Sequence, residues 1–138
     1  MTEKHTLNIT DITFDAAQYL PVEFGKCHNL HGHTYHIKNL EIQTEGIVDF
    51  SKIKKLVDEF DHCILTTTED KTKFQKILEF MVKENIDIFN LKFVAIPKPM
   101  VVVEYLGQYI KEQLKSIVGV IDATFELYET PTQGVKIP

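Results

Sequence analysis

The densest group of chemically active side chains lies between Cys27 and His33, a short segment with three of the six histidines and one of the two cysteines. On a strand, the i, i+2 spacing of His31 and His33 points both imidazoles to one face, where they could share a metal ion. Gly32 between them leaves room for close approach. The alternative is two exposed or locally hydrogen-bonded histidines at a strand start. Cys27 is a metal ligand, a structural thiol or a catalytic thiolate, and its spacing does not choose among these roles.

A second group follows in Asp61-His62-Cys63. An acid beside an imidazole can fix its tautomer and raise its basicity, as general acid–base chemistry requires. A structural Asp-His pair is the alternative. Cys63 itself is interpreted as a small buried thiol.

A third candidate is Glu129, which closes the last predicted strand and is followed by Thr130. A carboxylate at a strand end is usually solvated. A buried one could hold the guanidine-like edge of a ring by paired hydrogen bonds.

The elements that must position these side chains are predicted from apolar periodicity. The pattern slips parity between Ile9 and Ile12, which indicates a bulge or two short strands, and it slips again near Lys38-Asn39. Ser51 is the predicted cap of the first helix. The predicted strands cover residues 7–14, 31–44, 91–96 and 120–130, the helices cover 51–60, 74–85 and 103–118, and 66–70 is a predicted loop.

This order, β-β-α-α-β-α-β, predicts the α+β class, with an antiparallel sheet and helices on one face. A length of 138 residues without a linker or repeat predicts one domain, 1–138. The composition is that of a globular protein, with 43% apolar and 25% charged residues.

Charge and hydropathy exclude several classes of function. The net charge of −5, without a basic run, argues against nucleic-acid binding. No stretch approaches the ~20 apolar residues that cross a bilayer, and the polar N-terminus resembles no export signal. We therefore expect a cytoplasmic protein with no nucleic-acid or membrane partner and with reduced cysteines.

Taken together, these motifs resemble the family of 6-pyruvoyl tetrahydropterin synthase and 6-carboxytetrahydropterin synthase over most of the chain. The pieces that carry the resemblance are Phe14-Asp15-Ala16-Ala17 with Leu20, Cys27-x-x-x-His31-Gly32-His33-x-Tyr35, Gly46-x-Val48-Asp49-Phe50, Phe60-Asp61-His62-x-x-Leu65, Glu104-x-Leu106 and Glu129-Thr130.

The resemblance implies a tunnelling fold, in which each subunit has a four-stranded antiparallel sheet with helices on one side. Trimers would close a barrel, and two trimers would stack into a homohexamer. The second helix, near 72–84, would be a family-variable insertion.

The resemblance also implies roles for individual residues. His31 and His33 would bind Zn2+, with Gln18 at the place of the third ligand. Cys27 would be the thiolate base, and Asp61 and His62 would complete a proton relay. The pterin substrate would be bound by Glu129, Glu104 and Thr130.

The implied reaction is that of a zinc-dependent lyase acting on 7,8-dihydroneopterin triphosphate. The single cysteine in Cys27-x-x-x-His31-Gly32-His33 resembles the branch that makes 6-carboxytetrahydropterin on the route to queuosine and archaeosine. Acetaldehyde and triphosphate would leave.

The sequence departs from the family at Gln18, where the family carries a zinc-binding histidine. An amide oxygen should bind zinc more weakly than an imidazole. His28 could swing in as a substitute. In the pterin pocket, Val101 to Val103 and Thr66 also replace the usual residues.

These departures leave two alternatives open beside the 6-carboxytetrahydropterin lyase. One is a relative with another pterin product, such as 6-pyruvoyl tetrahydropterin or 6-hydroxymethyl-dihydropterin. The other is a non-catalytic oligomer that binds pterins or purines.

Overall fold

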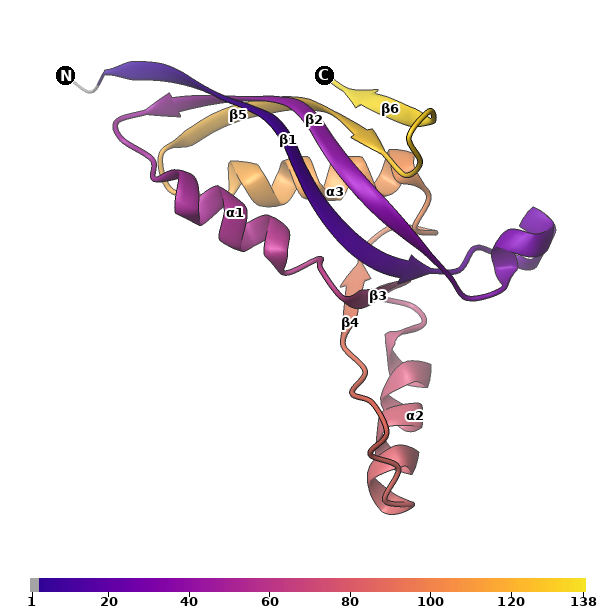
Figure 1. Ribbon diagram of the computed structural model, residues 1–138. Coiled ribbons are helices and arrows are strands. Elements are labelled where there is room, and N and C mark those ends of the chain that lie inside the picture. The colour runs from indigo at the N-terminus through magenta and orange to yellow at the C-terminus, as the bar shows by residue number, and fades with distance from the viewer. Residues whose placement is uncertain (1–2) are drawn as a thin grey trace.

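A six-stranded sheet organises the chain, and the computed structural model describes residues 3–138 (Figure 1). The elements in chain order are β1 (Lys4–Gln18), the 3-10 helix η1 (Val22–His28), β2 (His31–Glu45), α1 (Phe50–Asp58), β3 (Cys63–Thr67), α2 (Lys71–Lys83), β4 (Phe93–Ile96), α3 (Val103–Lys115), β5 (Val120–Tyr128) and β6 (Gly134–Ile137).

The sheet is mixed, with the strand order β4-β3-β1-β2-β5-β6. The pairs β1–β2, β2–β5 and β5–β6 are antiparallel, whereas β3 pairs in parallel with both β1 and β4. The α+β class is confirmed, but the expected four-stranded, wholly antiparallel sheet is wrong because β3 and β4 extend it in parallel.

The helices are arranged unequally around this sheet. Helices α1 and α3 lie along one face, as expected, while α2 projects away beyond β3 and β4 (Figure 1). Helix α2 contacts β4, and α1 and α3 contact each other. None of the helices within residues 3–138 is long and apolar enough to cross a bilayer.

Two strands were not predicted. Strand β3 has almost no polar alternation because it is buried on both faces, and it includes Thr66 and Thr67, which were expected in a loop. Strand β6 has four residues, too few for a periodic signal, and its pairing with β5 defines it. Strand β3 depends on β1 and β4, which are distant in sequence, whereas β6 forms a hairpin with the preceding strand β5.

The two predicted parity slips face each other in the hairpin of β1 and β2. Ile9 pairs with Leu40 and Asp11 pairs with Lys38, so β1 is one continuous strand whose register with β2 is kept. The bulge predicted near Lys38-Asn39 is confirmed, because the β2–β5 register shifts there and Asn39 has φ 53°.

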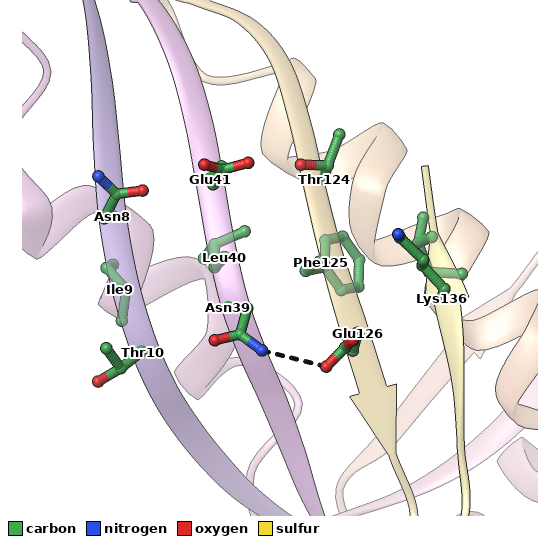
Figure 2. A pocket seen from close by; sticks show the side chains of 11 residues that line it. Asn8, Ile9, Thr10, Asn39, Leu40, Glu41, Thr124, Phe125, Glu126 and Lys136 are labelled. Atoms are coloured by element: carbon green, nitrogen blue, oxygen red, sulfur yellow. Dashed lines mark hydrogen bonds between the residues drawn. The ribbon is translucent and has the colours of Figure 1, made fainter.

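On the face of the sheet away from the helices, this bulge borders a hollow of about 500 Å³, shown in Figure 2. It runs across β1, β2, β5 and β6, and Asn39 donates a hydrogen bond to Glu126 there (3.2 Å).

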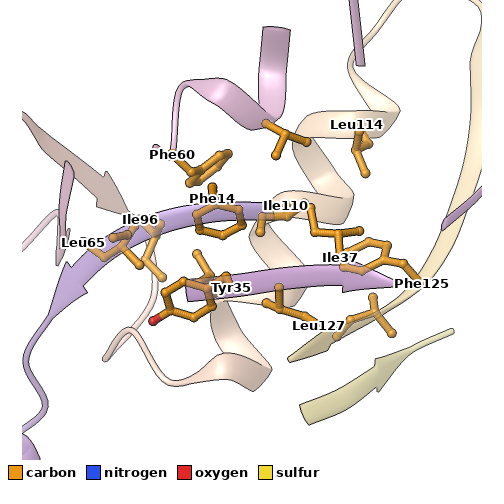
Figure 3. Packing of buried hydrophobic residues seen from close by; sticks show 14 of the residues in the cluster. Phe14, Tyr35, Ile37, Phe60, Leu65, Ile96, Ile110, Leu114, Phe125 and Leu127 are labelled. Atoms are coloured by element: carbon orange, nitrogen blue, oxygen red, sulfur yellow. The ribbon is translucent and has the colours of Figure 1, made fainter. Parts of the chain in front are cut away.

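The core lies between the sheet and helices α1 and α3 (Figure 3). The Phe14 and Tyr35 rings stack with centroids 4.9 Å apart, and Phe60 packs against Phe14 at 5.8 Å. Helix α1 is capped by Asp49, whose carboxylate accepts a hydrogen bond from the Ser51 backbone N–H (2.9 Å), so the prediction of Ser51 as the cap is wrong.

Candidate active site

His31 and His33 lie at the start of β2 on the face that also carries Tyr35. Their ring centroids are 5.0 Å apart, and the rings stand nearly perpendicular at 86°. The Tyr35 ring continues the row, 5.7 Å from that of His33. In the antiparallel register, Gln18 at the end of β1 lies directly opposite His31. The structure thus places Gln18 at the same end of the sheet as His31 and His33.

Gln18 is held in a chain of hydrogen bonds and is only 2% exposed. The Tyr35 hydroxyl donates to Gln18 Oε1 (2.6 Å), and Gln18 Nε2 lies 3.4 Å from His31 Nε2. On its other side, His31 Nδ1 donates to the Asn29 carbonyl (2.6 Å). Burial raises the pKa of Tyr35, with a further contribution from the negative charge of Glu129. The Tyr35 hydroxyl therefore remains a donor.

Two further histidines are engaged elsewhere. His28 Nδ1 bonds the Leu20 carbonyl (2.7 Å), which ties the imidazole to the end of β1. His36 Nδ1 bonds the Asp11 carboxylate across the hairpin (3.1 Å). In this arrangement His28 does not take the place of a third ligand.

The two cysteines occupy opposite environments. Cys27 is exposed on η1, and its carbonyl accepts the Leu20 backbone N–H (2.8 Å), which holds this segment beside the end of β1. Cys63 is buried, donates from Sγ to the Phe60 carbonyl (3.1 Å), and has its pKa raised to about 11 by burial. The Cys27 thiol is therefore accessible, whereas Cys63 is a structural thiol.

Asp61 and His62 form a hydrogen-bonded pair just before β3. His62 Nδ1 bonds Asp61 Oδ2 (2.7 Å), and Asp61 Oδ1 accepts the Asp15 backbone N–H (2.8 Å). That N–H is the main reason that the pKa of Asp61 is lowered, and the bond from His62 adds to it. The carboxylate is thus kept ionised and orients the imidazole. The His62 side chain is 79% exposed, so its Nε2 is open to a ligand.

His62 is anchored through its backbone, because its N–H donates to the Asp15 carbonyl (2.6 Å) in the parallel ladder of β1 and β3. His33 and His62 line the same hollow of about 420 Å³, together with Asp15, Thr34 and Cys63. The hollow therefore joins the histidine row of β2 to the acid–imidazole pair.

Glu129 is half-buried just after the end of β5, and its negative charge contributes to the raised pKa of Tyr35. Thr130 shapes the turn to β6, since its Oγ1 accepts the Gln133 backbone N–H (3.0 Å). The Glu129 N–H in turn donates to the Gln133 carbonyl (3.1 Å). Glu104 is exposed in the first turn of α3. Of these three residues, Glu129 acts electrostatically on Tyr35, the last member of the histidine row, while the Thr130 hydroxyl accepts a backbone N–H and can still donate its proton.

The donor set does not fit the three-ligand zinc centre that the resemblance implies. A catalytic zinc ion usually has three protein ligands drawn from imidazoles, thiolates and carboxylates. Within residues 3–138, no cluster of three or more His, Cys, Asp or Glu side chains could hold a metal ion. His31 and His33 supply two donors, while Gln18 presents its NH₂ group to His31.

One residue of the site was not assigned a role from the sequence. Tyr35 orients the Gln18 amide through the hydrogen bond from its hydroxyl. The signal was its i, i+2 spacing from His33, which places its side chain on the same face.

Comparisons with known proteins identify the family. The family model of 6-pyruvoyl tetrahydropterin synthase matches residues 8–138. A 6-carboxy-5,6,7,8-tetrahydropterin synthase from Haemophilus influenzae is 28% identical in an alignment that covers 88% of this chain and 91% of that protein. A Pyrococcus abyssi protein provisionally named as such a synthase is also 28% identical, over 90% of this chain and 84% of its own length.

Among solved structures, 6-pyruvoyl tetrahydropterin synthase from Plasmodium vivax superposes with a TM-score of 0.62. The match covers 98% of this chain and 97% of that one at 18% identity, so it supports the fold. Since the family model spans nearly the whole described domain, the chain belongs to the 6-pyruvoyl tetrahydropterin synthase family.

Proposed function

We propose that the protein is a lyase of the tetrahydropterin synthase type that converts 7,8-dihydroneopterin triphosphate and water into 6-carboxytetrahydropterin, acetaldehyde and triphosphate. The 6-carboxy product is chosen because the relatives from Haemophilus influenzae and Pyrococcus abyssi carry that name. This reaction would place the protein on the deazapurine route to queuosine and archaeosine.

The observation that carries the proposal is the ordered Asp61-His62 pair. With Nδ1 bonded to Asp61, the neutral His62 imidazole has its lone pair on the exposed Nε2. A base in that state can take a proton from a side-chain carbon or hydroxyl and return it to another atom of the same substrate. Asp61 stabilises the imidazolium formed in between.

Cys27 would supply a second proton-transfer group to the substrate. Its exposure on η1 leaves the thiol accessible, in contrast to Cys63. Two groups that exchange protons with neighbouring carbons are what a side-chain rearrangement before C–C cleavage requires.

Glu129 would anchor the ring of the substrate. A carboxylate pairs well with two parallel N–H donors, and the 2-amino and N3–H groups of a pterin form such an edge. The half-buried position of Glu129 beside Tyr35 gives this pairing more strength than it would have in open water. No step of the proposal passes through zinc, because the donor set does not fit that ion.

A second candidate is favoured by the Gln18 arrangement. A chain without the third zinc ligand could keep the Glu129 anchor and bind a pterin without turnover. The other alternative is an enzyme of the same family that forms a different pterin product.

The test is mass spectrometry of the pterins formed from 7,8-dihydroneopterin triphosphate by wild-type protein, with and without added zinc. We expect 6-carboxytetrahydropterin from the wild type and none from Cys27→Ala. The 6-pyruvoyl or 6-hydroxymethyl product would identify the other branch. Intact substrate that is nevertheless bound, with binding lost in Glu129→Gln, would establish the non-catalytic candidate.

A further inference from the structure

The register of the β1–β2 hairpin puts an amide where a metal donor would have to be. Gln18 lies opposite His31 and is 2% exposed, so its side chain has little freedom to turn outward. Its two polar ends each have a partner, Tyr35 on one side and His31 on the other.

The hydrogen bonds determine which end of the amide faces His31. A neutral imidazole has one N–H, and that of His31 is used at Nδ1, in the 2.6 Å bond to the Asn29 carbonyl. His31 Nε2 therefore has a lone pair and needs a donor. The Gln18 NH₂ group meets this need, and its Oε1 accepts the Tyr35 hydroxyl (2.6 Å). The reversed amide would set oxygen against the lone pair.

The hydrogen bonds that link Tyr35, Gln18 and His31 compete with a metal ion for the lone pair on His31 Nε2. Zinc would have to take the Nε2 lone pair of His31, which would leave the buried Gln18 NH₂ group without a partner. Turning the amide to offer its oxygen would break the bond from Tyr35, which is fully buried. The bond from His31 to the Asn29 carbonyl, in contrast, is the support that a metal-bound imidazole normally has. Of the residues around His31, Gln18 is therefore the one whose hydrogen bonds disfavour metal binding.

We infer that Gln18 is a positioning residue that holds His31 by an amide hydrogen bond in place of a metal ion. This chain then binds zinc at least about 10-fold more weakly than its Gln18→His variant, since a missing ligand should cost no less than a disturbed outer partner does. The inference concerns the site of the proposed function but does not depend on the reaction.

The test is metal binding by the metal-free full chain, without substrate. Zinc affinity is measured by competition with a chromophoric chelator, and Co²⁺ absorption reports tetrahedral coordination. We expect Gln18→His to bind one zinc per chain with the stated gain and to show the tetrahedral Co²⁺ spectrum, which the wild type lacks. In the Gln18→His background, His33→Ala should remove the gain and His28→Gln should leave it unchanged.

If the wild type bound zinc as tightly as Gln18→His does, the inference would be overturned. If Gln18→Ala also lost that tight binding, the Gln18 amide would be a zinc ligand.

A second measurement uses the wild type alone, in case the variants do not fold. Imidazole ¹⁵N NMR should show His31 protonated at Nδ1 and unprotonated at Nε2, unchanged by equimolar zinc. A shift of His31 Nε2 under equimolar zinc would contradict the inference. Because neither readout needs turnover, a failed lyase assay and a failed metal inference remain distinguishable.

Discussion

Individual side chains of one type have different chemistry here because their surroundings differ. Cys27 is exposed and Cys63 is buried, and burial raises the pKa of Cys63 to about 11. Among the histidines, His62 has an exposed ring with an ionised partner, whereas His28 bonds a backbone carbonyl. Spacing in the sequence predicts which residues share a face, and burial and partners decide which of them can react.

A thiol-labelling experiment separates the two cysteines. Under native conditions near pH 8 we expect an aromatic disulfide reagent to modify one thiol per chain quickly, at Cys27, because the thiolate is the reacting form. Denaturation should expose the second thiol. Cys27→Ala should leave no rapid phase, and rapid labelling of two thiols in the folded wild type would contradict the assignment.

Replacement of His62 tests the proton-transfer role. His62→Ala should lower kcat by about 10²–10⁴-fold, the usual contribution of a general acid–base group. The melting temperature should change little because the ring is exposed. His36→Ala, which removes an imidazole bonded to Asp11 instead, is the matched control and should retain activity. Equal activity of the two variants would exclude His62 as the proton carrier.

At the scale of elements, the long alternating strands and the amphipathic helices were predictable because their periodicity is local. Strands β3 and β6 were not, since β3 depends on parallel pairing with β1, and β6 depends on β5 and α3. A methyl group added at Gly107 in α3 would overlap Ile137 of β6, which shows how closely these two elements pack. The site followed the same rule: the shared face of His31 and His33 was predictable, but the orientation of Gln18 depends on Tyr35 and Asn29.

The cap of α1 gives a pH-dependent prediction. The Ser51 N–H lowers the pKa of Asp49 below its ordinary value of 3.8, so the charged cap stabilises the fold above that value. Asp49→Ala should lower the melting temperature by a few degrees at neutral pH. As the pH falls below 3.8 and the folded-state carboxylate is protonated, the difference from wild type should shrink. Ser51→Ala should lower the melting temperature less than Asp49→Ala does. A larger decrease in Ser51→Ala would show that Ser51 is the cap.

At the scale of the whole molecule, the sheet ends in two short strands, β4 and β6, each paired on one side within the chain. Open edges pair readily with other strands. The homohexamer, a dimer of trimers, that the family resemblance implies stays a prediction, and edge pairing between copies is the contact that we expect to contribute to it.

Light scattering coupled to size-exclusion chromatography tests the assembly. The expected mass is about six times the 15.9 kDa of one chain, largely independent of concentration. Lys136→Pro in β6 should shift the distribution toward smaller species, because it removes a backbone donor from that strand. A wild-type mass of 15.9 kDa at all concentrations would contradict the prediction.

The most direct test of the central claim is acetaldehyde release from 7,8-dihydroneopterin triphosphate, because acetaldehyde forms only when the side chain is cleaved between carbons. The lyase assignment predicts one acetaldehyde per 6-carboxytetrahydropterin formed, and loss of both in His62→Ala. Pterin turnover without acetaldehyde, or no turnover by a correctly folded and pterin-bound wild type, would contradict it.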